Sequence, residues 1–139
     1  MNVVVETHSL TKEFPGGRGV RDINLTVQQG QIFGFLGPNG AGKSTVVKML
    51  VGLLFPTSGE ARVLGLPAGD LAVRRRMGYL PELFRYQEWL SAEEVLRFHA
   101  KLCKLDGAKA RQRIGQVLKD VGLAGRERDR VRGYSKGMQ

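Results

Sequence analysis

The first half of the chain shows short apolar runs and alternating apolar and polar positions, a pattern that predicts β-strands. The clearest alternation is Ile23, Leu25 and Val27, as expected for a strand buried on one face only. Residues 32–36 are instead apolar almost throughout, which is typical of a strand buried on both faces of a mostly parallel sheet. The predicted strands are residues 3–5, 23–27, 32–36, 61–64 and 77–80.

Helical spacing of apolar residues dominates the second half. Ser91 and Glu94 have the Ser-x-x-Glu spacing of a capping box, which opens a helix that we expect to reach residue 104. Its predicted apolar side is Val95, Leu96, Phe98, Leu102 and Leu105, and that of the next helix, residues 108–121, is Ile114, Val117, Leu118 and Val121. Shorter helices are expected at 45–54 and 70–76, with a loop at 65–69. We therefore divide the chain into a β-rich portion, residues 1–82, and a helical portion, residues 83–139.

The strongest chemical signal follows directly on the apolar run 32–36. Residues 37–44 form a phosphate loop of the pattern Gly-x-x-x-x-Gly-Lys-Ser, in the strand-then-loop setting that this motif requires. Its glycines let the backbone N–H groups curl around an anion, Lys43 adds positive charge near the β- and γ-phosphates, and the Ser44 hydroxyl suits Mg²⁺. A glycine-rich turn that only joins strand to helix is the alternative, and the rarity of the pattern weighs against it. The predicted nucleotide-binding residues of this segment are Gly37, Pro38, Asn39, Gly40, Ala41, Gly42, Lys43, Ser44 and Thr45.

The formal net charge of +9 widens the range of partners to nucleic acid, an anionic membrane face or a phosphate-containing ligand. Two arginine groups stand out, Arg74 to Arg76 and the alternating Arg126, Arg128, Arg130 and Arg132. Neither is interleaved with the aromatic residues on which single-strand binders stack bases. We therefore interpret both groups as solvated faces and do not expect nucleic acid as a partner.

Cysteine content and hydropathy argue against a disulfide-stabilised or Cys-rich metal protein and against a membrane-spanning helix. Cys103 is the single cysteine, so no disulfide framework or Cys-rich metal site is expected. Because it lies between Leu102 and Leu105, we expect it in a helix core and not as a nucleophile. No apolar run approaches the ~20 residues that a membrane-spanning helix needs.

The last residues of the chain connect these landmarks to one family. Residues 133–139 read Gly-Tyr-Ser-Lys-Gly-Met-Gln, similar to the Leu-Ser-Gly-Gly-Gln signature motif of ATP-binding cassette (ABC) transporters, in a form common among ABC-2-type and multidrug exporters. With the phosphate loop and the two amphipathic helices before it, the whole chain resembles the ATP-binding subunit of these transporters. The resemblance implies an α/β P-loop NTPase fold with an N-terminal antiparallel β subdomain and an inserted helical subdomain. It also implies that Ser135 and Gly137 contact the ATP of a partner subunit.

Three more positions match functional residues of the family. Phe14 matches the aromatic residue that stacks on adenine, and Val20 would line the same ring; a core or hairpin aromatic is the alternative for Phe14. Glu82 stands where the family carries the glutamine of its Q-loop, and it would offer an oxygen to Mg²⁺ or its water beside Ser44. A helix-initiating surface glutamate is the alternative for Glu82.

The resemblance further implies partners and a location. These are a second cassette that completes an ATP-binding dimer, transmembrane permease subunits, ATP and Mg²⁺ as cofactors, and a cytoplasmic position, peripheral on the inner face of the cell membrane. Contact with the membrane would run only through the permease. Candidates for that contact, with core packing as an equal alternative, are Phe84, Tyr86, Trp89 and Leu90.

Catalytic residues of the family have no counterpart in this sequence. After Thr45 no aspartate follows four apolar residues, as in a Walker B strand, and neither an Asp-Glu pair nor a histidine at the switch position occurs. We therefore expect the whole protein to hydrolyse ATP and to power transport, with export favoured. This chain, interpreted as the N-terminal portion of a cassette that stops at the signature, is expected to be inactive alone. The alternatives are a non-transport ABC ATPase and an inert ATP-binding fragment; a GTPase would need an Asn-Lys-x-Asp guanine reader, which is absent.

Overall fold

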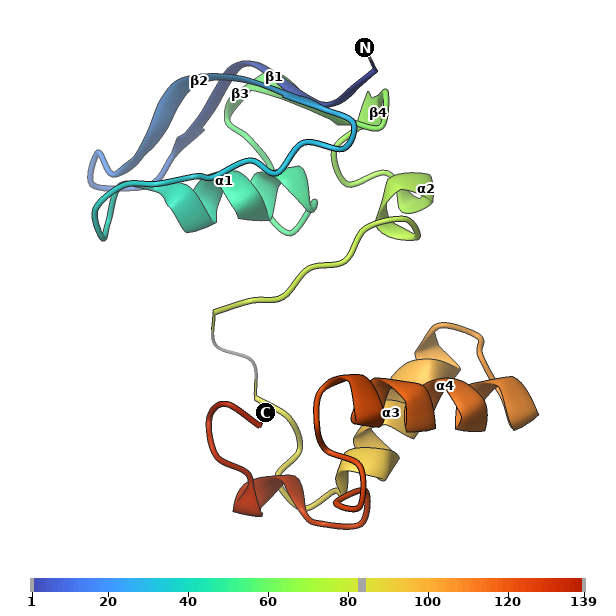
Figure 1. The fold of residues 1–139 in the computed structure, drawn as a ribbon. Coiled ribbons are helices and arrows are strands. Elements are labelled where there is room, and N and C mark those ends of the chain that lie inside the picture. Colours follow the sequence, from blue (N-terminus) through green and yellow to red (C-terminus); the bar gives the residue numbers. More distant parts are fainter. Residues whose placement is uncertain (1, 83–84, 139) are drawn as a thin grey trace. The chain divides into compact units, whose positions relative to one another are not determined.

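A computed structural model describes residues 2–82 and 85–138. The chain forms two compact units, Met1–Leu80 and Pro81–Gln139. The first unit contains β1 (Val3–Glu13), β2 (Gly19–Gln28), α1 (Lys43–Leu50), β3 (Ser58–Val63), β4 (Leu66–Pro67) and α2 (Leu71–Arg74) (Figure 1). The second contains α3 (Ala92–Leu102), α4 (Gly107–Asp120) and a 3-10 turn, η1 (Val131–Gly133).

The strands of the first unit form one antiparallel sheet in the order β2-β1-β3-β4. β1 pairs with β2 through Val5↔Val27 and Leu10↔Ile23, and with β3 through Thr7↔Ala61. Because β1 has a neighbour on both sides, it extends far beyond the predicted residues 3–5, through polar positions that the apolar pattern does not mark. The predicted antiparallel β subdomain is confirmed.

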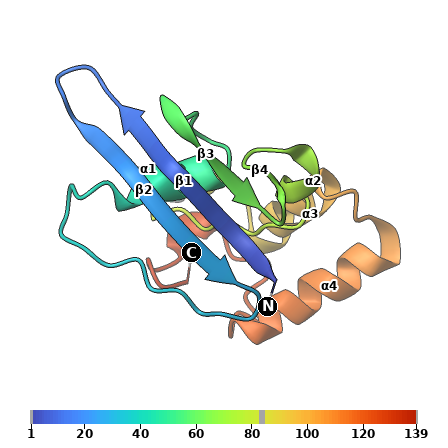
Figure 2. The same ribbon diagram turned by 90° about the horizontal axis from the view of Figure 1, so that it is seen from above.

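Helix α1 covers one face of this sheet, as Figures 1 and 2 show. Val46 and Met49 on α1 are buried against Leu10 of β1 and Val20 of β2. The helix begins at Lys43, two residues earlier than predicted, because Gly42 already accepts the hydrogen bond of the Val46 N–H at 3.0 Å. It ends at Leu50 instead of residue 54, and the N–H of Leu53 folds back to the carbonyl of Lys48.

The predicted strand at residues 32–36 is not formed. These residues run as a loop between β2 and α1 (Figure 2), and the side chains of Ile32 and Leu36 are 100% and 93% exposed. A strand needs a hydrogen-bonded neighbour, and no strand of the described residues runs beside this segment. The apolar pattern of a doubly buried strand is therefore present in the sequence without the sheet that would bury it.

Other boundaries also differ from the sequence-based prediction. Residues 77–80 form no strand, for the same lack of a neighbour, and the expected loop at 65–69 holds the two-residue strand β4, which pairs with β3. Helix α2 lies within the predicted 70–76, and its first turn is capped by the Asp70 carboxylate, which accepts the Ala72 N–H at 2.7 Å.

The second unit confirms the two predicted amphipathic helices. Ser91 and Glu94 form the capping box of α3, with the Glu94 N–H donating to Ser91 Oγ at 3.2 Å and the Ser91 N–H to Glu94 Oε2 at 2.8 Å. The core consists of Ala92, Ile114, Leu118 and Tyr134, against which Leu96, Ala100, Leu123 and Met138 pack. Within the described part of the chain, no helix has the length and apolar character that a membrane span requires.

The far end of α3 contradicts the prediction. Cys103 is exposed at the C-cap and not buried in a helix core, and Phe98 and Leu102 of the predicted apolar side are also exposed. The core takes only the face of α3 that α4 and Tyr134 cover, so apolar residues beyond that face remain in contact with water.

Candidate nucleotide-binding site

The phosphate loop, residues 37–44, joins the extended segment 32–36 to the first turn of α1. Gly42 is the N-cap of α1, with a left-handed backbone at φ +87°, and Gly40 has φ +83°. L-residues avoid this region, so the two glycines permit the loop to reverse direction just before the helix. The Ala41 N–H closes a turn on the Pro38 carbonyl at 3.2 Å.

The ammonium group of Lys43 lies inside the curve of the loop. Its Nζ donates to the carbonyl of Gly37 at 2.7 Å and to that of Pro38 at 2.8 Å. An ammonium has three N–H donors, so one of them is left for a further acceptor. The lysine thus holds the two ends of the loop together and still offers positive charge at the N-terminus of α1, where the helix dipole also favours an anion.

Val20 fixes the loop to the sheet. This buried residue of β2 lies so close to Gly42 that a Cβ built on the glycine would be 2.1 Å from Val20 Cγ1. A separation of that size is far below van der Waals contact, so only glycine fits at position 42 while Val20 keeps its place. Val20, which was predicted to line the base, is thus buried beneath Gly42 and supports the phosphate loop.

Phe14 lies at the same end of the first unit. It follows β1 in the β1–β2 turn, two residues beyond the pair Lys12↔Val20, and its N–H donates to the Arg18 carbonyl at 2.8 Å. The ring is 38% exposed, and Lys12 Nζ lies 5.6 Å from its centroid. Figure 1 shows this turn and the phosphate loop at the same end of the unit. An exposed aromatic face, two lysines and the loop are thus brought together at one corner.

The two residues predicted to hold Mg²⁺ lie in different units. Ser44 and Thr45 are in the first turn of α1, with Ser44 exposed at the helix start that carries Lys43. Glu82 is exposed in the second unit. A hydroxyl and a carboxylate are the hard oxygen ligands that Mg²⁺ accepts while it keeps most of its water, so the donor chemistry of both residues fits the ion.

The signature-like segment forms an exposed turn that follows a buried tyrosine. Ser135 and Gly137 are exposed, and the Met138 N–H donates to the Ser135 carbonyl at 2.9 Å. The neighbouring Tyr134 is buried in the helical core, and its hydroxyl donates to the Arg126 carbonyl at 2.7 Å. Burial raises the pKa of Tyr134, with a smaller contribution from the Asp129 carboxylate.

Arg126 is a structural residue that sequence reasoning missed, because it was included in the solvated arginine group. Its guanidinium donates to Asp129 Oδ2 at 2.8 Å, lies 5.5 Å from the centroid of the Tyr134 ring, and contacts Met138 Sδ at 3.5 Å. The Arg-x-x-Asp spacing of residues 126–129 could have predicted the ion pair between Arg126 and Asp129. It would have separated Arg126 from the other arginines of the series.

Three of the four residues predicted to contact a permease lie in the described part of the chain, in the segment before α3. Trp89 is 69% exposed, whereas Leu90 is half-buried and its carbonyl accepts the Val131 N–H at 2.9 Å. Tyr86 is half-buried and stacks edge-on against His99. Phe84 lies outside the described residues.

Comparison with known proteins identifies the relatives of this chain. A family profile described as "ABC transporter" matches residues 20–139. The uncharacterized ABC transporter ATP-binding protein YxlF of Bacillus subtilis is 38% identical over 98% of this chain and 45% of its own length. The daunorubicin/doxorubicin resistance ATP-binding protein DrrA of Streptomyces peucetius is 39% identical over 97% of this chain and 42% of its own length.

A solved ATP-binding subunit of an ABC transporter has the same fold. It superposes with a TM-score of 0.81 at 30% identity and covers 97% of this chain and 57% of its own length. The chain thus spans less than half the length of both sequence relatives. The superposition confirms the predicted P-loop NTPase fold, and the profile spans the phosphate loop and the signature-like turn. The chain therefore belongs to the ABC transporter family.

Proposed function

We propose that the protein is the ATP-binding subunit of an ABC transporter and that the phosphate loop around Lys43 binds the phosphates of ATP. The observation that carries this proposal is the position of Lys43, whose ammonium lies inside the loop with one donor left over, at the N-terminus of α1. Backbone N–H groups, a lysine and a helix dipole then act on the same anion.

The other predicted site residues have complementary roles. Phe14 supplies a stacking surface for the base, with Val20 beside it, and stacking discriminates weakly between adenine and guanine. Ser44 offers its hydroxyl oxygen to Mg²⁺, which would neutralise phosphate charge when bound. Glu82, in the second unit, is the carboxylate that the family resemblance would add as a ligand of the ion. The whole protein hydrolyses ATP with the help of residues that this sequence lacks.

The proposed partners follow from the exposed turn and from the family. Ser135 and Gly137 contact the ATP bound by a second cassette, so the active form is a dimer. Transmembrane permease subunits dock near the start of α3 and keep the protein at the inner face of the cell membrane. The drug resistance named for DrrA, together with the Tyr-Ser-Lys-Gly-Met form of the signature, supports export as the direction of transport.

The test is a titration with a fluorescent ATP analogue in the presence of Mg²⁺. Lys43→Ala should lose most of the affinity, at least about tenfold, because a charge-assisted contact to phosphate disappears. Lys48→Ala is the matched control, since Lys48 is an exposed lysine of the same helix outside the loop. Equal dissociation constants for the wild-type chain and Lys43→Ala would remove Lys43 from the site.

A further inference from the structure

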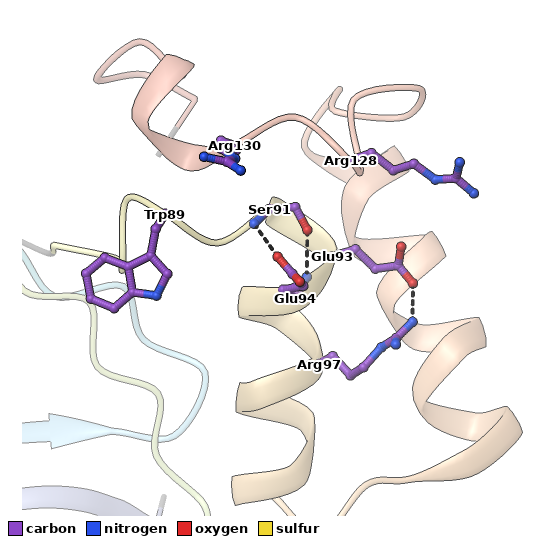
Figure 3. Close-up of a pocket in the computed structure, with 7 residues that line it drawn as sticks. All are labelled: Trp89, Ser91, Glu93, Glu94, Arg97, Arg128 and Arg130. Carbon is purple, nitrogen blue, oxygen red and sulfur yellow. Dashed lines mark hydrogen bonds and ion pairs between the residues drawn. The ribbon is translucent and has the colours of Figure 1, made fainter.

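A polar pocket of the second unit lies at the start of α3, and its lining includes no residue of the signature-like turn. It has a volume of about 420 Å³ and is lined by Trp89, Ser91, Glu93, Glu94, Arg97, Arg128 and Arg130. Figure 3 shows the Trp89 indole and Arg130 at one end and Arg128 at the other, with the first turn of α3 between them. The alternating arginine series therefore has two environments. Arg126, although exposed, is paired with Asp129 and lies over the Tyr134 ring, whereas Arg128 and Arg130 line the pocket.

The backbone around the pocket is fixed. Residues 127–131 run beside the start of α3, and the N–H groups of Ala92 and Glu93 donate to the carbonyls of Asp129 and Glu127 at 3.3 and 3.0 Å. Together with the capping box, these bonds occupy the first N–H groups of α3. The helix N-terminus is thus already satisfied, and any attraction for an anion comes from the arginine side chains.

Some charged side chains of the pocket already form ion pairs or hydrogen bonds, and these limit what a ligand could bind. Glu93 pairs with Arg97, and Glu94 accepts the Ser91 N–H, which is the main reason why the pKa of Glu94 is lowered; Arg130 and Arg97 lower it further. Among the described residues, no carboxylate forms an ion pair with Arg128 or Arg130. Because Arg97 is already paired with Glu93, the remaining two arginines match a ligand that brings separate, singly charged groups. A carboxylate side chain fits this balance better than a phosphate.

Trp89 indicates what kind of molecule brings that carboxylate. An exposed indole beside exposed arginines is the composition of a protein-interface hot spot, where Trp and Arg are enriched. Nucleic acid would be expected to use several stacking residues, and the lining holds one aromatic residue.

We infer that the pocket formed by Trp89, Arg128 and Arg130 is a protein-docking site that accepts an acidic segment, with carboxylates paired to the arginines and an apolar side chain on the indole. This inference rests on the proposed function, in that the partner that supplies the segment is the cytoplasmic side of the permease. It adds that Arg128 and Arg130 recognise the partner by binding acidic side chains of the partner. Trp89 supplies the apolar contact area.

Trp89 is the only tryptophan of the chain, so its fluorescence reports on the pocket without a label. The probe is a helical peptide with glutamates flanked by leucines, compared with the same peptide carrying glutamine in place of glutamate. The glutamate peptide should change Trp89 emission and bind about tenfold more tightly than the glutamine peptide at low salt, with a difference that shrinks as salt screens the charges.

Substitutions test whether Arg128 and Arg130 cause the preference for the glutamate peptide. The double variant Arg128→Gln/Arg130→Gln should bind both peptides equally, whereas Arg132→Gln should keep the preference, because Arg132 belongs to the same series but does not line the pocket. Circular dichroism establishes that each variant keeps its helix content, and the single variants replace the double variant if it does not fold.

Three results would overturn the inference. They are equal binding of both peptides by the wild-type chain, no binding of either, or a preference that survives the double variant. Displacement of the glutamate peptide by millimolar inorganic phosphate would also contradict it, since the pocket would then be a small-anion site. A fluorescent ATP analogue is titrated in the same samples, so a failure of the nucleotide site is distinguished from a failure of the docking site.

Discussion

The contact between Val20 and the phosphate loop gives a quantitative prediction for Gly42→Ala. Two costs are expected. A left-handed backbone costs an L-residue about 1–2 kcal/mol, and Gly42 has φ +87°. The new Cβ would also lie 2.1 Å from Val20 Cγ1, and relieving such an overlap in a packed core costs about 1–3 kcal/mol more.

A substitution at Gly40 allows the backbone cost to be measured apart from the cost of the overlap with Val20. Gly40 has nearly the same backbone angle, φ +83°, but a Cβ at this position would meet no heavy atom within 4 Å. Gly40→Ala should therefore lose about 1–2 kcal/mol of unfolding free energy, from the backbone alone. The excess loss of Gly42→Ala over Gly40→Ala measures the contact with Val20.

A double-mutant cycle completes the test. Val20→Ala removes the methyl group that a Cβ at position 42 would overlap, so Gly42→Ala should cost about 1–3 kcal/mol less in this background than in the wild-type chain. Unfolding free energies come from urea titrations followed by far-UV circular dichroism. If Gly42→Ala costs no more than Gly40→Ala, or if Val20→Ala fails to reduce its cost, then Val20 does not support the loop in the way described.

Three further predictions concern other parts of the chain. ATP and GTP should bind with affinities within about tenfold of each other, and Phe14→Ala should weaken the binding of both, because stacking forms no hydrogen bond to the edge of the base. Competition titrations measure these affinities, and strong ATP selectivity that persists in Phe14→Ala would exclude Phe14 as the residue on which the base stacks. Leu36→Gln should change the unfolding free energy by less than about 0.5 kcal/mol, because the side chain is 93% exposed; urea titration would reveal a buried strand by a loss of several kcal/mol. The Ser91 N–H lowers the pKa of Glu94 in the folded state, so its contribution to stability is present above the ordinary value of 4.5 and is lost as the pH falls through the lowered pKa. Acid unfolding curves should therefore be less pH-dependent for Glu94→Gln, and identical slopes would contradict this.

Local signals in the sequence predicted the features that local interactions decide. The capping box of Ser91 and Glu94 lies within four residues, and the glycines of the phosphate loop, which its backbone angles require, lie within six. Both were found from sequence because their physical causes are short-range.

Features that depend on distant neighbours were predicted less well. The apolar run at residues 32–36 indicates a strand, but hydrogen-bonded neighbours decide whether a strand forms, and the described residues provide none. Likewise, Cys103 lies among leucines in sequence, yet the face of α3 that carries it has no covering element. The resemblance predicted that Val20 lines the base, and the close approach of Val20 to Gly42 was not predicted, since the two residues are far apart in sequence.

The hydroxyl of Tyr134 has a consequence for how the signature-like turn can move. The family commonly carries leucine at this position, a side chain that packs but forms no hydrogen bond. Here the ring is buried among the helices and the hydroxyl is bonded to the Arg126 backbone, so the turn is attached to the helical unit at two points of one side chain. Ser135 and Gly137 should thus follow any displacement of α3 and α4 as a rigid extension of them. A force applied to the helices would then reach the signature-like turn without loss in a flexible joint.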